Sequence, residues 1–362
     1  ATTLKAGINI PIAAERKHFL SRYGLFLATA FLLLIAALPH QPGLPVAGQY
    51  MLAILAFAVT VWMTEAVSYP VSAILITTLM AFMLGFAPEV ASPDKLMGTS
   101  KALSVALGGF SNTAWALVGG ALFLAAAMTR TGLDRRIALL VLAKVGAKTN
   151  RILIGVIVIG FVLSFFVPST TARVSCMVPI VMGIIFAFGV PLKSRFAGML
   201  MIAVAQADSL WNVGIKTAAA QNMVAVSFIE KQLGVSISWL DWFIAAAPFS
   251  AIMSVVLYFV LMKMMPPKKQ EIDGGAAIVE KALKDLGPMR AEEKKLLAIS
   301  LLLLFFWSTE KIVHPFDTST TTIAAIALMF MPRIGVMDWK EVQNSIPWGT
   351  LVLFGIGISL GS

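Results

Sequence analysis

A short polar segment, Val167-Pro168-Ser169-Thr170-Thr171-Ala172-Arg173, carries the side chains of this chain that are best suited to chemistry. It separates two apolar runs, 152–167 and 174–189, each of about 16 residues, or roughly 24 Å as a helix, which is less than the roughly 30 Å of a bilayer core. Two helices too short to span predict a re-entrant hairpin with its tip at mid-membrane. Irregular backbone at that depth must be buried in protein or line a cavity, and an ionisable residue there marks a candidate functional site.

The chemistry expected at this tip is the binding of an anion. Ser169, Thr170 and Thr171 offer hydroxyl groups, and the start of the outgoing helix offers free backbone N–H groups. The positive end of the helix dipole lies there too, near Arg173, and this arrangement suits a carboxylate. The alternative is that the hydroxyl groups bond back to the preceding helical turn. The proline, the short flanking runs and the arginine argue against that alternative.

A second interruption lies between Gln206 and Asn222, inside the apolar segment 196–229. It contains Lys216, Thr217 and Asn222, which are further candidate ligands for the anion. Charged and amide side chains are costly within a span unless they face a cavity. Two discontinuous helices in one half of a chain are the sequence pattern typical of a transport site. The alternative is that 209–217 is an extramembrane turn between two ordinary spans.

The composition predicts an all-α polytopic membrane protein. Hydrophobic residues make up 59% of the chain and charged residues 13%, against about 25% charged residues in soluble domains. One cysteine and three histidines leave no disulfide framework and no metal site. No catalytic residues are expected, because an intramembrane enzyme would need a constellation that Asp208 alone cannot supply. The net charge of +10 indicates basic loops beside the lipid bilayer and not a nucleic-acid partner.

The expected spans are 24–39, 48–66, 70–86, 113–131, the hairpin 151–189, the broken span 196–233, 240–264, 296–313, 318–332 and one from about 347. Lysine and arginine cluster in loops that fall on one side of the membrane. By the positive-inside rule this predicts a multi-pass protein of a cell membrane, most simply a bacterial inner membrane, with a cytoplasmic N-terminus.

The chain also contains an internal repeat. Trp62-Met63-Thr64-Glu65-Ala66 and Trp307-Ser308-Thr309-Glu310-Lys311 each end an apolar span, and each is followed by another span and then by a Trp-led, Gly-rich one at Trp115 or Trp348. An odd number of crossings separates the two copies, which predicts an inverted-repeat transporter, although chance can also produce so short a motif. The expected divisions are an N-terminal segment with the first span (1–47), a first repeat (48–265), a cytoplasmic linker (266–295) and the start of an incomplete second repeat (296–362).

Other polar residues are expected to have structural roles. Arg135 and Arg136 are predicted to lie on an interfacial amphipathic helix that faces lipid headgroups. Trp239 is predicted to belong to an interfacial aromatic belt. Glu310 is expected to cap or snorkel at a span end. The triplet Ser111-Asn112-Thr113 is expected to cap a helix N-terminus.

These features resemble the divalent anion–sodium symporter family of di- and tricarboxylate transporters. The resemblance rests on Trp62–Ala66, on Thr131–Ala138, on the tip Pro168–Arg173 and on the break Gly214–Asn222, in family order over nearly the whole chain. It implies a homodimer, with a scaffold domain at the interface and a transport domain that moves as an elevator. It also implies that Ser169, Thr170 and Thr171 stand at a Ser-Asn-Thr signature that binds a substrate carboxylate and helps to frame a sodium site.

Two departures from the family pattern bear on coupling. Thr170 replaces the asparagine of the signature, with Arg173 close behind, and the second break has Lys216 instead of paired prolines. The chain is most similar to the branch of bacterial citrate/succinate and tartrate/succinate antiporters and plastid 2-oxoglutarate/malate translocators, which exchange dicarboxylates without sodium. We therefore expect a sodium-independent exchanger of succinate, malate, 2-oxoglutarate, tartrate or citrate. Arg173 and Lys216 would supply the counter-charge for the anion, and no cofactor is needed. The alternative is a sodium-coupled symporter.

Overall fold

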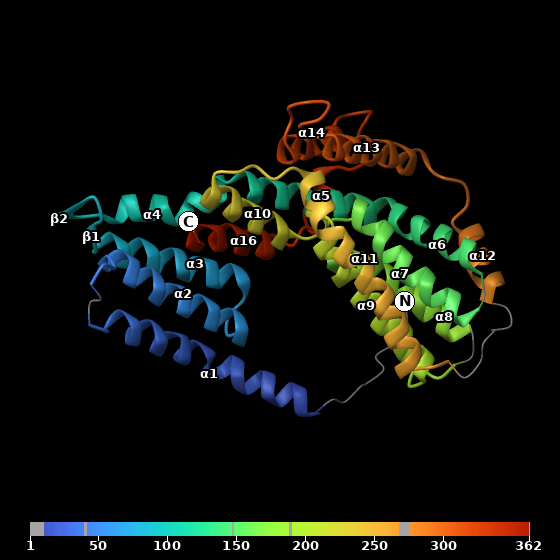
Figure 1. Ribbon diagram of the computed structural model, residues 1–362, viewed down its shortest axis with the longest axis horizontal. Coiled ribbons are helices and arrows are strands. Elements are labelled where there is room, and N and C mark those ends of the chain that lie inside the picture. Colours follow the sequence, from blue (N-terminus) through green and yellow to red (C-terminus); the bar gives the residue numbers. More distant parts are fainter. Residues whose placement is uncertain (1–10, 40–41, 147, 188–189, 268–274, 362) are drawn as a thin grey trace. The chain divides into compact units, whose positions relative to one another are not determined.

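The computed structural model describes residues 11–39, 42–146, 148–187, 190–267 and 275–361. Those residues are mainly helical, with one short antiparallel pair of strands. Five of the described helices are long and apolar enough to cross a membrane, namely Val46–Thr64, Thr113–Thr131, Thr149–Phe166, Arg195–Gly214 and Trp239–Met264. The fold is therefore the predicted all-α polytopic membrane fold. It divides into two compact units, which we call the N-terminal unit (1–115 with 348–362) and the central unit (116–347) (Figure 1).

The N-terminal unit is a helical bundle that includes the last helix of the chain. α1 packs on α2, and α16 packs on α3 and α4. The return of α16 depends on glycine, because a Cβ atom at Gly109 would lie 2.0 Å from the main-chain oxygen of Gly355. The Gly109 N–H also donates to Ser359 Oγ at 2.9 Å. Its elements are α1 (Pro11–Ala36), α2 (Val46–Thr64), α3 (Tyr69–Leu79) with a π-helical turn (Met80–Leu84), β1 (Pro88–Glu89), β2 (Ser92–Leu96), α4 (Thr99–Leu107), a 3-10 turn (Gly108–Ser111) and α16 (Trp348–Gly361).

The central unit contains the predicted hairpin and the predicted broken helix. α7 packs on α9, and α9 packs on both α8 and α11 (Figure 1). Its elements are α5 (Thr113–Thr131, which begins at the unit boundary), α6 (Leu133–Val145), α7 (Thr149–Phe166), α8 (Thr170–Ala187), α9 (Arg195–Gly214), the 3-10 turn η3 (Lys216–Ala218), α10 (Ala220–Leu233), α11 (Trp239–Met264), α12 (Gly275–Asp285), α13 (Ala291–Ser308), α14 (Thr318–Phe330) and α15 (Trp339–Val342).

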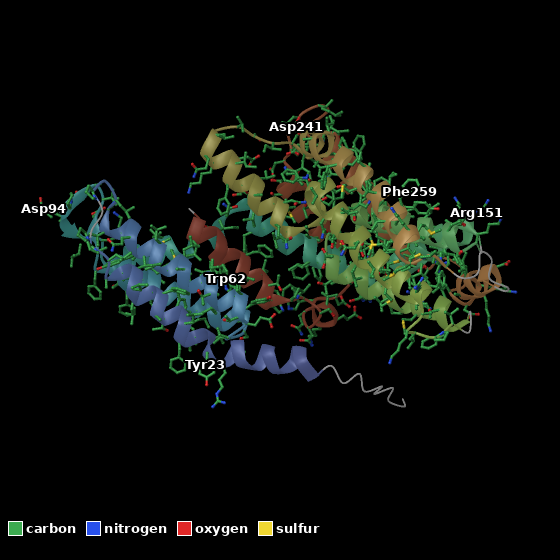
Figure 2. The ribbon with its side chains drawn as sticks, turned by 60° about the horizontal axis from the view of Figure 1, so that its bottom comes forward. Tyr23, Trp62, Asp94, Arg151, Asp241 and Phe259 are labelled. Atoms are coloured by element: carbon green, nitrogen blue, oxygen red, sulfur yellow. The ribbon has the colours of Figure 1, made fainter. Side chains whose placement is uncertain are left out.

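Small residues bring α7 and α9 together. A Cβ atom at Gly160 would lie 3.0 Å from Ala207 Cβ, so the two helices approach closely at this point. Close backbone approach through small residues is how membrane helices gain packing energy, because lipid gives no hydrophobic drive for their association. This contact sets Asp208, the residue after Ala207, against the hairpin. In the same unit, α11 leaves large apolar side chains such as Phe259 exposed, as expected for a face toward lipid (Figure 2).

Most predicted span boundaries agree with the observed helices to within a few residues. The hairpin expected at 151–189 is present as the helix pair α7 and α8, although residues 188–189 lie outside the described part. The premise that neither arm could span is wrong for α7, which has 18 residues and is long and apolar enough to cross a membrane. The broken span expected at 196–233 is present as α9, η3 and α10, with its break at 215–219. The helix expected around Arg135 and Arg136 is present as α6, whereas the short helices α4, α12 and α15 and the β1–β2 pair were not among the predicted elements.

The compact units do not follow the expected repeat boundaries. The first repeat expected at 48–265 contributes residues to both units, and so does the segment 296–362. The segment expected as a polar linker, 266–295, contains α12, which packs on α6 and α8 within the central unit. The inverted repeat itself remains a prediction.

Candidate functional site

The first break separates the two arms of the hairpin. α7 ends at Phe166 and α8 begins at Thr170, with Pro168 between them. Ser169 Oγ accepts from the Ala172 N–H at 3.4 Å, and the Ser169 carbonyl accepts from the Arg173 N–H at 3.1 Å. Within the described part of the chain, the N–H groups of Thr170 and Thr171 have no acceptor. The start of α8 thus presents two free donors next to hydroxyl groups, and Thr171 is exposed.

The second break has the same character. α9 ends at Gly214, η3 fills the gap and α10 begins at Ala220. Among the described residues, no acceptor faces the N–H groups of Ala220 and Gln221. The Asn222 side-chain amide donates to the Ile215 carbonyl at 3.0 Å, and also to the carbonyl of Asn212. Asn222, predicted as a ligand, therefore uses its amide N–H groups to cap the end of α9.

Arg173 joins the two breaks. Its side chain is fully buried. Nη1 donates to the carbonyl of Val167 in the first break at 2.6 Å and to the carbonyl of Ala218 in the second break at 3.2 Å. Nε pairs with Asp208 Oδ1 at 3.0 Å, and Nη2 donates to the side-chain oxygen of Asn212. The guanidinium group is thus directed at protein oxygens from both breaks.

Asp208 and Asn212 complete this connection, and neither was among the predicted site residues. They are four residues apart and so lie on one face of α9. Asn212 donates to Thr170 Oγ1 at 2.7 Å, which ties the start of α8 to α9. Asp208 balances the charge of Arg173, while its Oδ2 atom is buried without a partner within the described ranges. The four-residue spacing of Asp208 and Asn212 was the only sequence signal that they share a helix face. Their partner Arg173 could not be inferred from it, because Arg173 lies 35 residues before Asp208.

Lys216 and Thr217 are both buried in the second break. Lys216 Nζ donates to the Ile237 carbonyl at 2.7 Å, and no described carboxylate lies within ion-pair distance of it. Thr217 Oγ1 accepts from the ring N–H of Trp239 at 3.1 Å. Trp239 is 3% exposed, so its predicted place in an interfacial belt is wrong. The aromatic ring packs against the second break instead of facing lipid.

Glu310 lies behind Trp239 and has the capping role that the sequence predicted. Its carboxylate accepts from the N–H of Trp239 at 2.9 Å and from the N–H and hydroxyl of Thr318 at 3.2 and 2.8 Å. These bonds satisfy free donors at the starts of α11 and α14. Asn112 Oδ1 likewise accepts from the Ala114 N–H at 2.7 Å, which confirms the cap expected at Ser111-Asn112-Thr113.

Arg136 contradicts its predicted position at the lipid headgroups. It is 7% exposed and forms a two-point ion pair with Glu293, with Nε–Oε1 and Nη2–Oε2 distances of 3.1 and 3.2 Å. Nη1 donates to the Gly287 carbonyl at 3.0 Å, so Arg136 holds the end of the expected linker onto α6. Burial opposes ionisation of Glu293, but the bonds from Arg136 and from the Arg290 N–H prevail and lower its pKa. Arg135, in contrast, is exposed.

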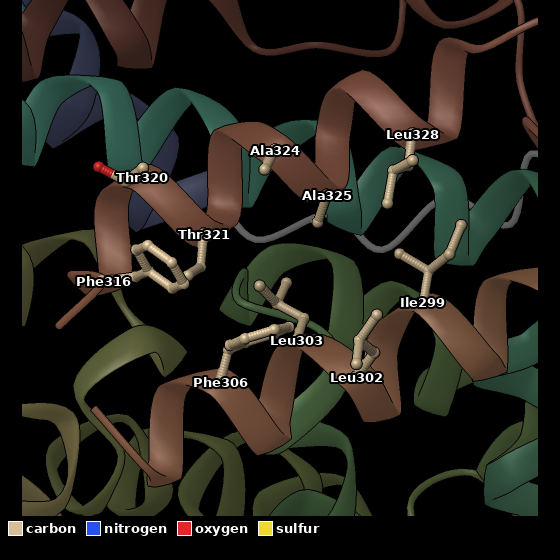
Figure 3. Close-up of a pocket in the computed structure, with 10 residues that line it drawn as sticks. All are labelled: Ile299, Leu302, Leu303, Phe306, Phe316, Thr320, Thr321, Ala324, Ala325 and Leu328. Carbon is tan, nitrogen blue, oxygen red and sulfur yellow. The ribbon is translucent and has the colours of Figure 1, made fainter. Parts of the chain in front are cut away.

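Two cavities of the central unit differ in character. A cavity of about 290 Å³ between α13 and α14 is lined by Leu302, Leu303, Phe306 and other mainly apolar residues (Figure 3). It offers no charge to neutralise an anion. A larger cavity of about 670 Å³ lies among α6, α8 and the α12–α13 connection and has a polar lining. In the described part of the chain, no group of three or more His, Cys, Asp or Glu residues is arranged to hold a metal ion.

Comparison with known proteins gives consistent relatives. Residues 20–362 match the family described as "Sodium:sulfate symporter transmembrane region". A "Membrane protein" of Cupriavidus necator is 58% identical over 340 residues (94% of this chain, 66% of that protein). "Inner membrane protein YbhI" of Escherichia coli is 34% identical over 270 residues (73% and 56%). "Sodium-dependent dicarboxylate transporter SdcS" of Staphylococcus saprophyticus is 29% identical over 362 residues (93% and 66%).

The chain thus spans just under two thirds of the length of the Cupriavidus and Staphylococcus relatives. The match covers both units and both helix breaks described above. The chain is a multi-pass membrane protein that belongs to the sodium:sulfate symporter family, the divalent anion–sodium symporters.

Proposed function

We propose that the two helix breaks bind a di- or tricarboxylate, and that the full protein is a secondary active transporter of such anions. The observation that carries this proposal is the pair of helix N-termini at Thr170 and Ala220, each with two free N–H groups. Helix N-termini attract carboxylates through these donors and through the helix dipole. Ser169 and Thr171 add hydroxyl donors, and the Arg173 network holds the two termini together. The name of the Staphylococcus relative supports dicarboxylates as the substrate class.

In the same proposal, the protein exchanges carboxylates without sodium. Sodium is bound in proteins by oxygen ligands such as the main-chain carbonyls of broken helices. Here the Arg173 guanidinium donates hydrogen bonds to one carbonyl from each break, so a sodium ion would have to compete with Arg173 for these oxygen atoms. Asp208 cancels the charge of Arg173, so Lys216 is the fixed cation near the substrate. Together with about half a positive charge at each of the two helix N-termini, it offsets the two negative charges of a dicarboxylate. An empty carrier would then have to move an uncompensated charge through the membrane, which is costly and makes substrate obligatory in both directions.

Several wider features belong to this proposal as well. They are an elevator-type movement, a homodimer, a bacterial inner membrane location and a cytoplasmic N-terminus. The predicted inverted repeat would provide the usual basis for such alternating access.

A sodium-coupled symporter is the second candidate, and one observation favours it. Asp208 Oδ2 is a buried anionic oxygen without a partner in the described part of the chain, and a cation would satisfy it. The names of the Staphylococcus relatives also specify sodium dependence.

Uptake of radiolabelled succinate by proteoliposomes of the full-length protein separates the two candidates. We expect uptake that requires internal dicarboxylate and does not change when sodium is replaced by choline. Accumulation in vesicles empty of substrate, driven by a sodium gradient, would establish the symporter instead. Failure of each of succinate, malate, 2-oxoglutarate, tartrate and citrate to be transported would overturn the substrate class.

A further inference from the structure

The polar cavity of about 670 Å³ in the central unit lies next to the hairpin tip but is not part of it. One face of α8 forms its wall, from Ala172 through Ser175 and Cys176 to Pro179. Ala172 directly follows Thr171, the exposed candidate ligand. The volume falls within the roughly 300–1,000 Å³ typical of small-molecule sites. The cavity therefore reaches the first turn of α8, beside Thr171 in sequence, and extends toward the α5–α6 turn and the α12–α13 connection.

At the exposed edge of this cavity two arginines lie beside a single carboxylate, and the other charged groups of the lining are buried. Arg136 and Glu293 neutralise each other in a buried pair. Asp134 is 3% exposed and bonded to the Arg135 N–H at 2.7 Å, and burial raises the pKa of its carboxyl group. The remaining groups are Arg135, Arg290 and Asp285, which are exposed.

Neither of these two exposed arginines is committed to an ion pair. Within the described part of the chain, Arg135 and Arg290 have no carboxylate partner. Arg290 uses Nη2 to donate to the carbonyl of Thr131 at the α5–α6 turn, which positions its guanidinium at the cavity edge. Arginine binds carboxylates with paired, charge-assisted hydrogen bonds, so these two guanidinium groups are suited to hold a carboxylate at the cavity edge.

We infer that this cavity is an antechamber in which Arg135 and Arg290 bind the carboxylate substrate before it reaches the hairpin tip. The inference rests on the proposed function, since it names the route to the same site. It assigns the two arginines to recruitment of the anion and not to the final site. Removal of either should therefore raise the Michaelis constant for a dicarboxylate and leave the maximal rate nearly unchanged.

Cys176 gives a direct probe of this cavity, because it lines the wall and is the single cysteine of the chain. The experiment uses full-length protein in detergent, with any cysteine outside these 362 residues changed to serine. Cys176 is modified in parallel with an anionic and a cationic methanethiosulfonate of similar size. The quantity compared is the ratio of the anionic to the cationic labelling rate. We expect this ratio to be about 10-fold higher for Cys176 than for a free thiol in solution, which is the low end of electrostatic steering. Succinate should slow both reactions.

The double variant Arg135→Gln/Arg290→Gln should lose this preference. Arg151→Gln is the matched control, because Arg151 is exposed at the start of α7 and does not line the cavity (Figure 2). It should retain the preference of the wild type. The inference is overturned by equal relative rates in the wild type, by an unchanged preference in the double variant, or by a thiol that reacts with neither reagent.

The labelling experiment does not depend on transport. If transport succeeds but the charge preference is absent, the antechamber fails and the proposed function stands. If the preference and the succinate protection are present but no dicarboxylate is transported, the cavity is an anion site and the transport function fails. Thermal unfolding of each variant, compared with the wild type, shows that a lost preference does not come from misfolding.

Discussion

Replacement of Arg173 by methionine is the most informative perturbation of the described site. It leaves the Asp208 carboxylate buried without a cation, which typically costs about 3–5 kcal/mol. It also leaves the carbonyls of Val167 and Ala218 without their donor, at about 1–3 kcal/mol each. The combined loss is comparable with the whole stability of many proteins, about 5–15 kcal/mol. We therefore expect the variant to be poorly folded or strongly destabilised.

The double variant Arg173→Met/Asp208→Leu separates two effects of losing Arg173. One is the unpaired charge of Asp208, and the other is the loss of the hydrogen bonds that join the two breaks. This variant removes the uncompensated carboxylate, so it should be more stable than Arg173→Met by about 3–5 kcal/mol. It does not restore donors to the carbonyls of the two breaks. Carboxylate exchange should therefore stay lost although the protein folds.

The measurements are unfolding of the full-length protein in mixed detergent micelles and succinate exchange in proteoliposomes. Arg151→Met is the control, because a surface substitution usually changes stability by less than about 0.5 kcal/mol. The role assigned to Arg173 is refuted if the unfolding free energy of Arg173→Met lies within about 1 kcal/mol of the wild-type value, or if the double variant exchanges succinate at the wild-type rate.

Three further predictions concern other parts of the central unit. Thr171→Val removes one exposed hydroxyl donor and should raise the Michaelis constant for succinate by roughly 5- to 150-fold, and unchanged kinetics would return Thr171 to a structural role. Lys216→Met removes the fixed cation and should permit uptake into vesicles that contain no substrate; strict exchange in this variant would contradict the counter-charge argument. Glu293→Gln should lower stability by about 1–3 kcal/mol, as measured by unfolding. Because the pKa of Glu293 is lowered in the folded state, the ion pair stabilises above its unfolded pKa of about 4.3 and is lost as the pH falls through the folded pKa. The difference in unfolding free energy between Glu293→Gln and the wild type should thus be equal at about pH 8 and about pH 6. A difference that becomes smaller between these two pH values would argue against the ion pair.

Both helix breaks were predictable from the polar residues that interrupt apolar sequence. Pro168 and the hydroxyl residues after it separate two apolar runs, and the polar residues within the segment 196–229 favoured a break. The expected length of the first run was wrong, because α7 extends over Thr149–Phe166 and is long enough to cross a membrane. The position of Arg173 at the tip followed from the same reasoning. Its role did not, because the partner Asp208 comes from another helix whose position depends on the contact between Gly160 and Ala207.

Tertiary contacts overrode local pattern at the residues that were misjudged. Trp239 follows a polar loop at the start of a span, as belt aromatics do, but the second break and Glu310 supply partners that bury it. Arg136 lies in a charged, amphipathic segment, and its partner Glu293 is far along the chain (|i−j|=157). The polarity of the segment 266–295 predicts a linker but does not show that α12 forms within it, with enough apolar side chains on one face to pack on α6 and α8.

The central claim is that a carboxylate binds at the two helix N-termini and that Arg173 holds these termini together without binding the anion. A high-resolution structure of the full-length protein with bound succinate tests it most directly. We expect a carboxylate within hydrogen-bond distance of the N–H groups of Thr170 and Thr171 or of Ala220 and Gln221, with Arg173 still paired to Asp208. An anion that binds Arg173 in place of Asp208, or that touches neither break, would contradict it.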